Sequence, residues 1–429
     1  MTLVLVVLFG LMLLGIPVAF AILSAGMAYL ATTGGSMLVV AQRLIYGLNS
    51  FTLLAVPLFI LVGNLMDFGG ISKRLTDWAK SILGWLPGGL GIVTVFSCAI
   101  FAALTGSGPA TVAAIGSIML PSMLKAGYSR ETSAGLVASA GGLGPIIPPS
   151  IPMIIYGVTM NLSIPAMFMA GVVPGLVIAL ALSLVNVVFA YRNPEVLKHA
   201  KTMKFDFKES MKLFWKALGA LGLPVLILGG IYGGIFTPTE SAAVGIVYAL
   251  ILGFALKELK VKDLPKILIN SLKTSTMVNF IIAAASLFSW VVSKSQIGTA
   301  ISNAFISFVG GSQALYLFVL VVVLLIVGCL MDNVAATLIL APILIPVGIA
   351  LGCNELHIGM LFCICLVVGF VTPPFGYNLF TAVSISGLNF KQIVKGALPF
   401  LLTEILLLFV FAYVPGIITW LPRLMGYGY

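Results

Sequence analysis

Charged residues are scarce in this chain, and their scarcity indicates which solvent surrounds it. Only 8% of the 429 residues are Asp, Glu, Lys or Arg, and 61% are hydrophobic, whereas soluble domains carry roughly 25% charged residues. A surface this poor in charge excludes a water-soluble protein. Strands of a membrane barrel alternate over about ten residues, and the apolar runs here are too long and unbroken for that pattern. The sequence therefore predicts an all-α polytopic membrane protein.

Several chemical motifs are also absent from the sequence. The two histidines and five cysteines have spacings that fit no metal or redox site. No G-x-x-x-x-G-K-[ST] phosphate loop occurs, which excludes ATP hydrolysis by that route. No paired nucleophile and base, or paired acids, are placed for proteolysis within the membrane. We therefore expect no enzyme and no organic cofactor. The net charge of +10 is interpreted as a topology signal, not as a nucleic-acid site.

Basic residues indicate on which side of the membrane each connection lies. The longest basic connection is 192–216, and a second spans 257–273. If these and the shorter basic connections are cytoplasmic, 19 of the 22 Lys and Arg residues lie inside, and the exceptions are Arg43, Lys294 and Arg423. This is a strong positive-inside bias. We expect a multi-pass protein of the bacterial inner membrane.

Apolar segments alternate with these connections along the whole chain. They run roughly 3–32, 51–68, 90–104, 109–124, 131–160, 166–191, 217–256, 277–292, 313–331, 334–351, 356–386 and 392–413. The stretch 90–124 has two short apolar legs between basic flanks, so it is expected to enter from the inside and return as a re-entrant hairpin. Two short spanning helices are the alternative.

Helix-breaking residues recur at a fixed spacing of 225. Pro121 pairs with Pro346 in this way, and the doubled Pro148-Pro149 pairs with Pro373-Pro374. Recurring breaks indicate a recurring architecture. The flanks of the first hairpin are basic and those of the second are nearly free of positive charge, which indicates opposite orientation. We therefore expect an inverted-repeat bundle, in which substrate and ion sites lie near the membrane midplane.

The repeat suggests a division of the chain. The first inverted repeat is expected over 1–191, with a hairpin at about 90–124 and a broken helix at about 131–160. The basic connection 192–216 follows. The second repeat is expected over 217–429, with a hairpin at about 313–351 and a broken helix at about 356–386.

Glycine, proline and hydroxyl residues gather at the two hairpin tips and the two breaks, where free carbonyls and hydroxyls can act as ligands. The candidate substrate- and ion-binding residues are Thr105, Gly106, Ser107, Gly108, Thr111, Gly142, Gly144, Pro148, Pro149, Ser150, Asp332, Asn333, Thr337, Gly369, Thr372, Pro373, Gly376 and Asn378. A hard monovalent cation needs several oxygen ligands, so we expect Na⁺ as the coupling ion. Its expected ligands are Ser107, Gly144, Asp332 and Thr372.

Four acidic or basic residues within or beside apolar segments leave alternatives open. Asp332 is an acid at a hairpin tip, where intramembrane acids are functional by default, but it could also cap the following helix. Glu240 follows a Thr-Pro helix start and could simply face the helix dipole. Lys294 could meet a carboxylate or extend to the membrane interface. Whether Glu404, in the last apolar segment, meets a partner chain is open.

Four motifs in order resemble the large membrane subunit of tripartite ATP-independent periplasmic (TRAP) transporters. They are Ser107-Gly-Pro-Ala-Thr111, Gly142-Leu-Gly-Pro-Ile-Ile-Pro-Pro-Ser150, Gly234-Ile-Phe-Thr-Pro-Thr-Glu-Ser-Ala-Ala-Val-Gly245 and Thr372-Pro-Pro-Phe-Gly-Tyr-Asn378. The resemblance covers essentially the whole chain.

The resemblance implies a Na⁺-driven importer of organic acids of the sialic acid or C4-dicarboxylate class. It also implies an elevator, in which a transport domain with both hairpins slides against a scaffold. The implied partners are a small four-helix membrane (Q) subunit, expected to be a separate chain or absent, and a periplasmic substrate-binding protein. A stand-alone ion-coupled carrier, a channel and a membrane enzyme are the alternatives.

Overall fold

The chain folds entirely into helices over the residues that the computed structural model describes, which are 2–295 and 304–428. Apart from two short 3-10 helices these are α-helices, and no strand occurs in those two ranges. Eight helices are long and apolar enough to span a membrane. The structure is therefore that of an all-α polytopic membrane protein, as the composition predicts. Residues 296–303 and 429, within the expected second repeat, and Met1, in the first, lie outside the described residues.

The helices follow one another through short connections. In chain order they are α1 (Thr2–Leu13), α2 (Val18–Thr33), α3 (Leu38–Leu48), η1 (Phe51–Leu54), α4 (Ala55–Phe68), α5 (Ile71–Leu83), α6 (Gly89–Thr105), α7 (Gly108–Lys125), α8 (Arg130–Gly141), α9 (Ile151–Met160), α10 (Ile164–Tyr191), α11 (Pro194–Thr202), α12 (Phe207–Tyr232), α13 (Pro238–Ala255), η2 (Val261–Asp263), α14 (Leu264–Lys294), α16 (Gln313–Leu330), α17 (Asn333–Ala350), α18 (Glu355–Gly369), α19 (Tyr377–Ser386), α20 (Phe390–Tyr413) and α21 (Gly416–Leu424).

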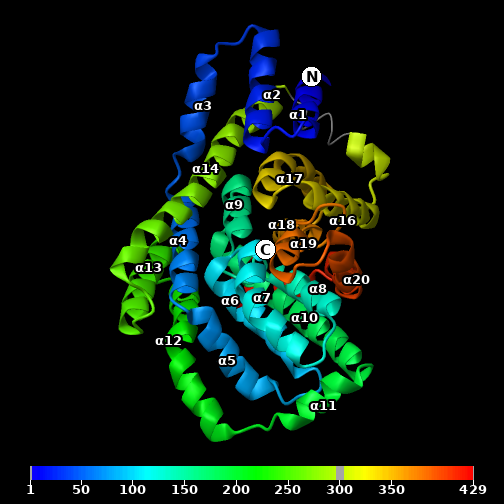
Figure 1. The fold of residues 1–429 in the computed structure, drawn as a ribbon. Coiled ribbons are helices and arrows are strands. Elements are labelled where there is room, and N and C mark those ends of the chain that lie inside the picture. The colour runs from blue at the N-terminus through cyan, green and yellow to red at the C-terminus, as the bar shows by residue number, and fades with distance from the viewer. Residues whose placement is uncertain (1, 296–303, 429) are drawn as a thin grey trace.

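Two groups of helices can be distinguished by their contacts. The frame helices, α2, α3, α4, α12, α13 and α14, pack along one another and form one side of the molecule in Figure 1. The core helices, α6–α10 and α16–α20, pack into a second body beside them. The two groups meet where α4 packs on α6 and α14 packs on α17, and α5 bridges from α12 to α6.

The helix bounds repeat with the spacing of the sequence breaks. Helix α7 spans 108–125 and α17 spans 333–350, a shift of 225 at both ends. The stretch 38–68, from the start of α3 to the end of α4, corresponds to α14 at 264–294 with a shift of 226. Each half thus contains a hairpin (α6–α7 or α16–α17) followed by a broken helix (α8–α9 or α18–α19). This is the inverted-repeat bundle expected from the sequence. Dividing the chain at 191 and 216 stays an interpretation.

Some apolar segments are divided differently from the sequence prediction. The segment 3–32 is wrong as a single unit, because the chain turns at Gly15 (φ +79°) and Pro17 between α1 and α2. The segment 217–256 likewise divides into α12 and α13, where Thr237 caps the second helix. Helix α3 was missed because it is short, with Arg43 in its middle.

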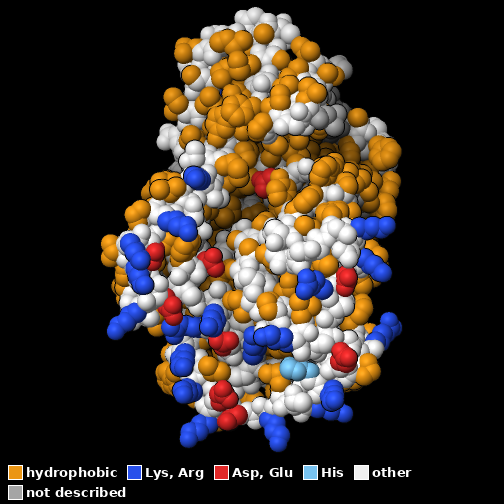
Figure 2. All heavy atoms as spheres, viewed as in Figure 1, with side chains coloured by type: hydrophobic (Ala, Val, Ile, Leu, Met, Phe, Trp, Pro, Cys, Tyr) orange, Lys and Arg blue, Asp and Glu red, His pale blue; other side chains and the backbone are white. Residues whose placement is uncertain are grey.

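Positive charge collects at one end of the molecule. Figure 2 shows Lys and Arg side chains over the lower half of the visible face, where α5, α11 and α12 lie, while the end formed by α1 and α2 is mostly apolar. An ion pair between Arg74 and Glu258, at 3.1 Å, joins α5 to the α13–α14 connection. This distribution agrees with a cytoplasmic location for the charged end.

Hairpin and broken helix pack backbone to backbone in the second half. A methyl group added at Gly369 would lie 2.4 Å from the carbonyl carbon of Gly328. The contact joins the end of α18 to α16, the first helix of the second hairpin. Close approach of this kind requires residues without a Cβ atom.

Labelling tests the orientation. In a Cys-free background, Lys204→Cys should react with a membrane-impermeant maleimide only after the cytoplasmic side is opened, and Lys294→Cys should react in intact cells. Both side chains are exposed, so reactivity reports sidedness. Labelling of Lys204→Cys from outside would invert the topology.

A second prediction concerns the Gly328–Gly369 contact. Gly369→Ala should lower the free energy of unfolding by about 1–3 kcal/mol, the usual cost of overpacking, and should reduce transport because hairpin and broken helix are pushed apart. Thermal unfolding in detergent measures the first effect. Gly229→Ala is the matched control, since open space surrounds Gly229. Equal melting temperatures for the two variants would show that the close contact does not matter.

Candidate functional site

The first hairpin tip is a tight turn tied together by hydroxyl groups. Helix α6 ends in Gly106 with φ +59°, and Ser107 is the extended N-cap of α7. The Thr105 and Thr111 hydroxyls lie 3.2 Å apart, and Thr111 also donates to the Ser107 carbonyl at 2.8 Å. The turn therefore brings together oxygens of Thr105, Ser107 and Thr111 around the glycine.

This tip contacts both broken helices. Methyl groups built at its glycines would collide with them: at Gly106, 2.9 Å from the Pro149 carbonyl oxygen, and at Gly108, 2.8 Å from Asn378 Oδ1. A methyl group at Gly144 would in turn lie 2.6 Å from the Ser107 carbonyl oxygen. Glycine at these positions allows the hairpin to touch the first break, and the second broken helix reaches it through Asn378.

The first break is a stretch of turns between α8 and α9. It begins after Gly141 and includes the predicted residues Gly142, Pro148 and Pro149. Ser150 caps α9, where its hydroxyl accepts from the Met153 N–H at 3.4 Å and donates to the Pro145 carbonyl at 2.6 Å. Within the break the Leu143 carbonyl accepts from the Ile146 and Ile147 N–H groups at 3.1 and 2.8 Å, whereas the carbonyls of Gly142 and Gly144 have no backbone hydrogen bond among the described residues. Free carbonyls of this kind supply ligands in broken-helix transporters.

The second hairpin tip is capped by its acid. Asp332 Oδ2 accepts from the Val334 N–H at 2.9 Å, so the capping alternative is confirmed. This contact does not bear on an additional ion role. The tip rests on the second break, where the Gly376 N–H donates to the Cys329 carbonyl at 3.4 Å. Within that break Thr372 donates its hydroxyl proton to the Val368 carbonyl at 2.9 Å.

Several buried polar atoms near the tips have no hydrogen-bond partner among the described residues. They are both side-chain polar atoms of Asn333, the hydroxyls of Thr337 and Ser139, and the Oδ1 atom of Asn378. The side-chain NH2 group of Asn378 donates to the Ala138 carbonyl of α8 at 3.0 Å. Buried polar atoms are normally paired with protein, water or ligand. Oxygens of this kind fit a hard cation.

The four expected Na⁺ ligands fall into two pairs. Ser107 and Gly144 meet at the first tip, and Asp332 and Thr372 belong to the second hairpin and its break. No hydrogen bond joins one pair to the other in the part of the chain that the structure describes. Of the remaining predicted residues of the second half, Gly369 at the end of α18 contacts Gly328 and Cys329, close to the second tip. Pro373 lies within the break between α18 and α19.

An inner cavity of about 230 Å³ reaches the first hairpin tip. Its walls include Thr105 and Ser107 from the tip, Ile151 at the start of α9, and Asn64 and Asp67 from frame helix α4. Sequence reasoning missed the last two. The only signal for them was a pair of polar residues near the end of an apolar segment.

An outer cavity of about 490 Å³ lies farther along α9, towards its C-terminal end. It is bounded by frame helices α3 and α14, by the second half of α9 and by Leu338 of α17. The two cavities occupy repeat-related positions. Positions 60, 63, 64 and 67 of the inner cavity, shifted by 226, become 286, 289, 290 and 293, all of which line the outer one.

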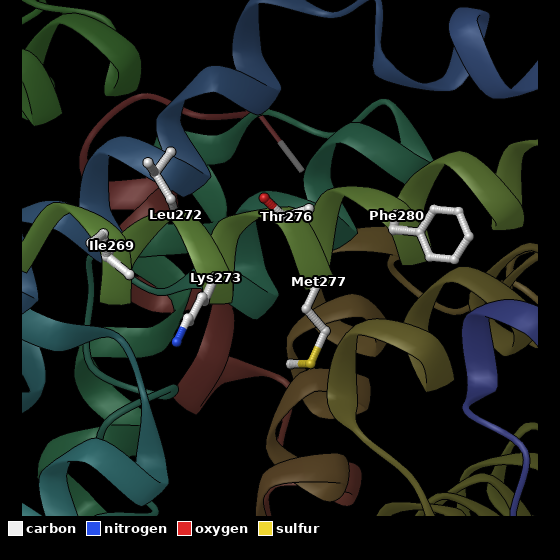
Figure 3. Close-up of a pocket in the computed structure, with 6 residues that line it drawn as sticks. All are labelled: Ile269, Leu272, Lys273, Thr276, Met277 and Phe280. Carbon is white, nitrogen blue, oxygen red and sulfur yellow. The ribbon is translucent and has the colours of Figure 1, made fainter.

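A third hollow lies away from the tips. About 560 Å³ in size, it is lined by Ile269, Leu272, Lys273, Thr276, Met277 and Phe280. Figure 3 shows that all six come from successive turns of α14 and that Lys273 and Met277 point the same way. A single helix face of this kind brings no polar groups together, so this hollow is not the candidate site.

The structure also shows the surroundings of three other residues singled out in the sequence. Glu240 lies in the first turn of α13, as the helix-dipole alternative expects, and it closes a capping box by accepting from the Thr237 N–H at 2.8 Å. Lys294 is exposed at the end of α14 and does not line the outer cavity. Glu404 is buried in α20, and its Oε2 atom has no partner among the described residues.

Comparison with known proteins gives one consistent family. Residues 5–417 match the family described as "Tripartite ATP-independent periplasmic transporter, DctM component". The chain is 39% identical to the C4-dicarboxylate TRAP transporter large permease protein DctM of Pseudomonas aeruginosa, over 94% of each chain. It is 34% identical to the sialic acid TRAP transporter large permease protein SiaM of Vibrio cholerae, over 98% of each.

Two further matches add architecture. The isethionate TRAP transporter permease protein DctMQ of Oleidesulfovibrio alaskensis is 39% identical over 95% of this chain, which covers 64% of that protein. The crystal structure of the Alcanivorax borkumensis YdaH transporter, described as having an unusual topology, superposes with a TM-score of 0.56 at 15% identity, over 90% of this chain and 88% of that one. The second likeness concerns the fold alone. With the family match and the relatives, it leads to one conclusion: the chain belongs to the DctM family of TRAP transporter large permeases and is a multi-pass transporter subunit of the bacterial inner membrane, not an enzyme.

Proposed function

We propose that this permease uses a Na⁺ gradient to import an organic acid anion. The observation that carries the proposal is the packing of a hairpin tip against broken helices, with buried oxygens of Asn333, Thr337 and Asn378 left without a protein partner. Such oxygens suit a monovalent cation because carbonyl, amide and hydroxyl groups bind it without a large desolvation cost. The relatives named for C4-dicarboxylate, sialic acid and isethionate support an acidic solute.

The movement that we propose is an elevator. The core helices carry both hairpins, both breaks and most of the buried polar atoms, while the frame helices present their faces to them. Cavities near the two ends of α9 open between the two groups. Sliding of the core against the frame would expose the tips first through one cavity and then through the other.

The proposed partners are a small membrane subunit and a periplasmic substrate-binding protein. The family description names a tripartite transporter, and the longer relative named DctMQ supports a second membrane component. A stand-alone carrier of the same fold is the alternative. Copurification of a small four-helix subunit with the tagged permease would favour the tripartite form, whereas uptake by the permease alone would favour the alternative.

Ion dependence is the first test. Proteoliposomes that contain the permease, its small subunit and a panel of binding proteins should accumulate an acid when an inward Na⁺ gradient is imposed, with no ATP present. The acids to be tested are radiolabelled C4-dicarboxylate, sialic acid and isethionate. Undiminished uptake when choline replaces Na⁺, with a proton gradient sufficient, would contradict the ion assignment.

The role of Asp332 is the second test. Asp332→Ala removes both the cap and the charge, and it should weaken the apparent Na⁺ affinity at least tenfold or abolish uptake. Ser107→Ala removes one neutral oxygen and should weaken the apparent Na⁺ affinity less, because carbonyl ligands remain. Asp332→Ser is the matched control, since serine preserves an N-cap but not the carboxylate. Normal uptake by Asp332→Ser with unchanged Na⁺ dependence would limit Asp332 to capping.

A further inference from the structure

The outer cavity contains a cation held between two aromatic rings. Arg43, on α3, places its guanidinium carbon 5.4 Å from the centroid of the Trp290 ring and 5.6 Å from that of the Tyr46 ring. Both distances lie within the range of a cation–π contact, about 6 Å. The rings fix the guanidinium at the wall of the cavity and leave its N–H groups as donors.

No acid neutralises this guanidinium. Among the described residues no carboxylate lies within ion-pair distance of Arg43, and no Asp or Glu lines the cavity. The polar groups that do line it are neutral: Asn49 and Ser50 at the end of α3, Thr159 on α9, and Ser286, Ser289 and Ser293 on α14. An unpaired arginine among hydroxyl and amide groups is a combination that recognises carboxylate or sulfonate.

The repeat shows that the charge is specific to the outer side. Under the shift of 226, Arg43 corresponds to Ile269, which does not line the inner cavity. Asp67, the acid of the inner cavity, corresponds to Ser293 of the outer one. Two cavities of related architecture therefore carry opposite charges, with a cation on the outside and a carboxylate on the inside.

The outer cavity also lies next to the first break. Its α9 wall includes Ile155, and the inner cavity includes Ile151 of the same helix. Four helical residues span about 6 Å. A solute in the outer cavity is thus about one helical turn from the position at which the inner cavity meets the hairpin tip.

We propose that the outer cavity is a capture site, in which Arg43 holds the carboxylate or sulfonate of the imported anion before it reaches the hairpin tips. The inference rests on the proposed import of organic acids and names the residue that receives them. The neutral hydroxyls of α14 would then donate hydrogen bonds to the rest of the solute and accept hydrogen bonds from it. Asp67 in the related inner cavity favours release of the same anion by repulsion.

Trp290 allows capture to be measured directly. The chain has five tryptophans, and replacement of Trp78, Trp85, Trp215 and Trp420 by Phe leaves Trp290 as the only reporter. The acid identified by the uptake panel is titrated into the purified permease with its small subunit, and Trp290 fluorescence is recorded. We expect a saturable change whose dissociation constant rises at least tenfold in Arg43→Gln. Lys294→Gln, which removes a nearby cation outside the cavity, should bind as the parent does.

Uptake provides the second measurement. Arg43→Gln should lower kcat/KM at least tenfold in proteoliposomes, and Arg43→Lys should be intermediate because it keeps the charge but loses the planar fork. If Arg43→Gln does not accumulate in the membrane, Arg43→Lys carries the test, with a fall of several-fold expected. Unchanged binding and uptake in the Arg43 variants, or an equal loss in Lys294→Gln, would overturn the proposal.

Two controls separate other occupants of the cavity. If Arg43 binds a lipid phosphate, the effect of Arg43→Gln should vanish in vesicles of an uncharged galactolipid, which has no phosphate. If it binds an acidic side chain of the binding protein, Arg43→Gln should weaken binding of the unloaded binding protein. Either result would overturn the capture site. Absence of uptake by the parent protein for every acid tested would instead contradict the proposed function.

Discussion

Backbone groups freed at a helix break must be satisfied inside the protein when the break is away from water, and this constraint organises the molecule. Each unpaired group in hydrocarbon costs several kcal/mol, so a break survives only when it is enclosed. Here the first hairpin tip encloses the first break, through the contact of Gly144 with the Ser107 carbonyl, and the second tip encloses the second. The glycines permit contacts that a Cβ atom would forbid. The same enclosure gathers oxygens where an ion can use them.

The enclosed breaks cannot be reached on their own. The frame helices help to form the cavities that give access to them from either side. Because the frame repeats with a spacing of 226, close to the 225 of the core, a cavity near one end of α9 has a related cavity near the other. Repeat symmetry fixes where the cavities lie, but the side chains on them are free to differ. Arg43 in the outer cavity and Asp67 in the inner one are such a difference, and in the proposed mechanism they favour entry of an acidic solute at the first and its release at the second.

The sequence was informative wherever structure depends on local residues. Glycine and proline spacing placed the tips at Ser107 and Asp332 and the breaks after Gly141 and Gly369, because these residues act on the backbone where they stand. It was uninformative wherever the structure depends on distant contacts. Nothing local to Arg43 indicates that Trp290, far along the chain, lies over its guanidinium.

Helix ends were predicted less well than tips for a related reason. Helix α3 carries polar residues and ends at Asn49, so it lacks the apolar length that defines a spanning segment. It is ordered by packing against α14, where a methyl group at Gly47 would lie 2.5 Å from the Ser286 Cβ atom. The inner-cavity residues Asn64 and Asp67 were missed because their role depends on the hairpin opposite them.

The central claim is that the paired hairpin tips form an ion-responsive unit. Hydrogen–deuterium exchange of the purified permease in Na⁺ and in choline at equal ionic strength tests it most directly. The account predicts slower exchange in Na⁺ for peptides that contain 105–111 and 331–337, with no change in α12. Identical exchange at both tips in the two salts would contradict it.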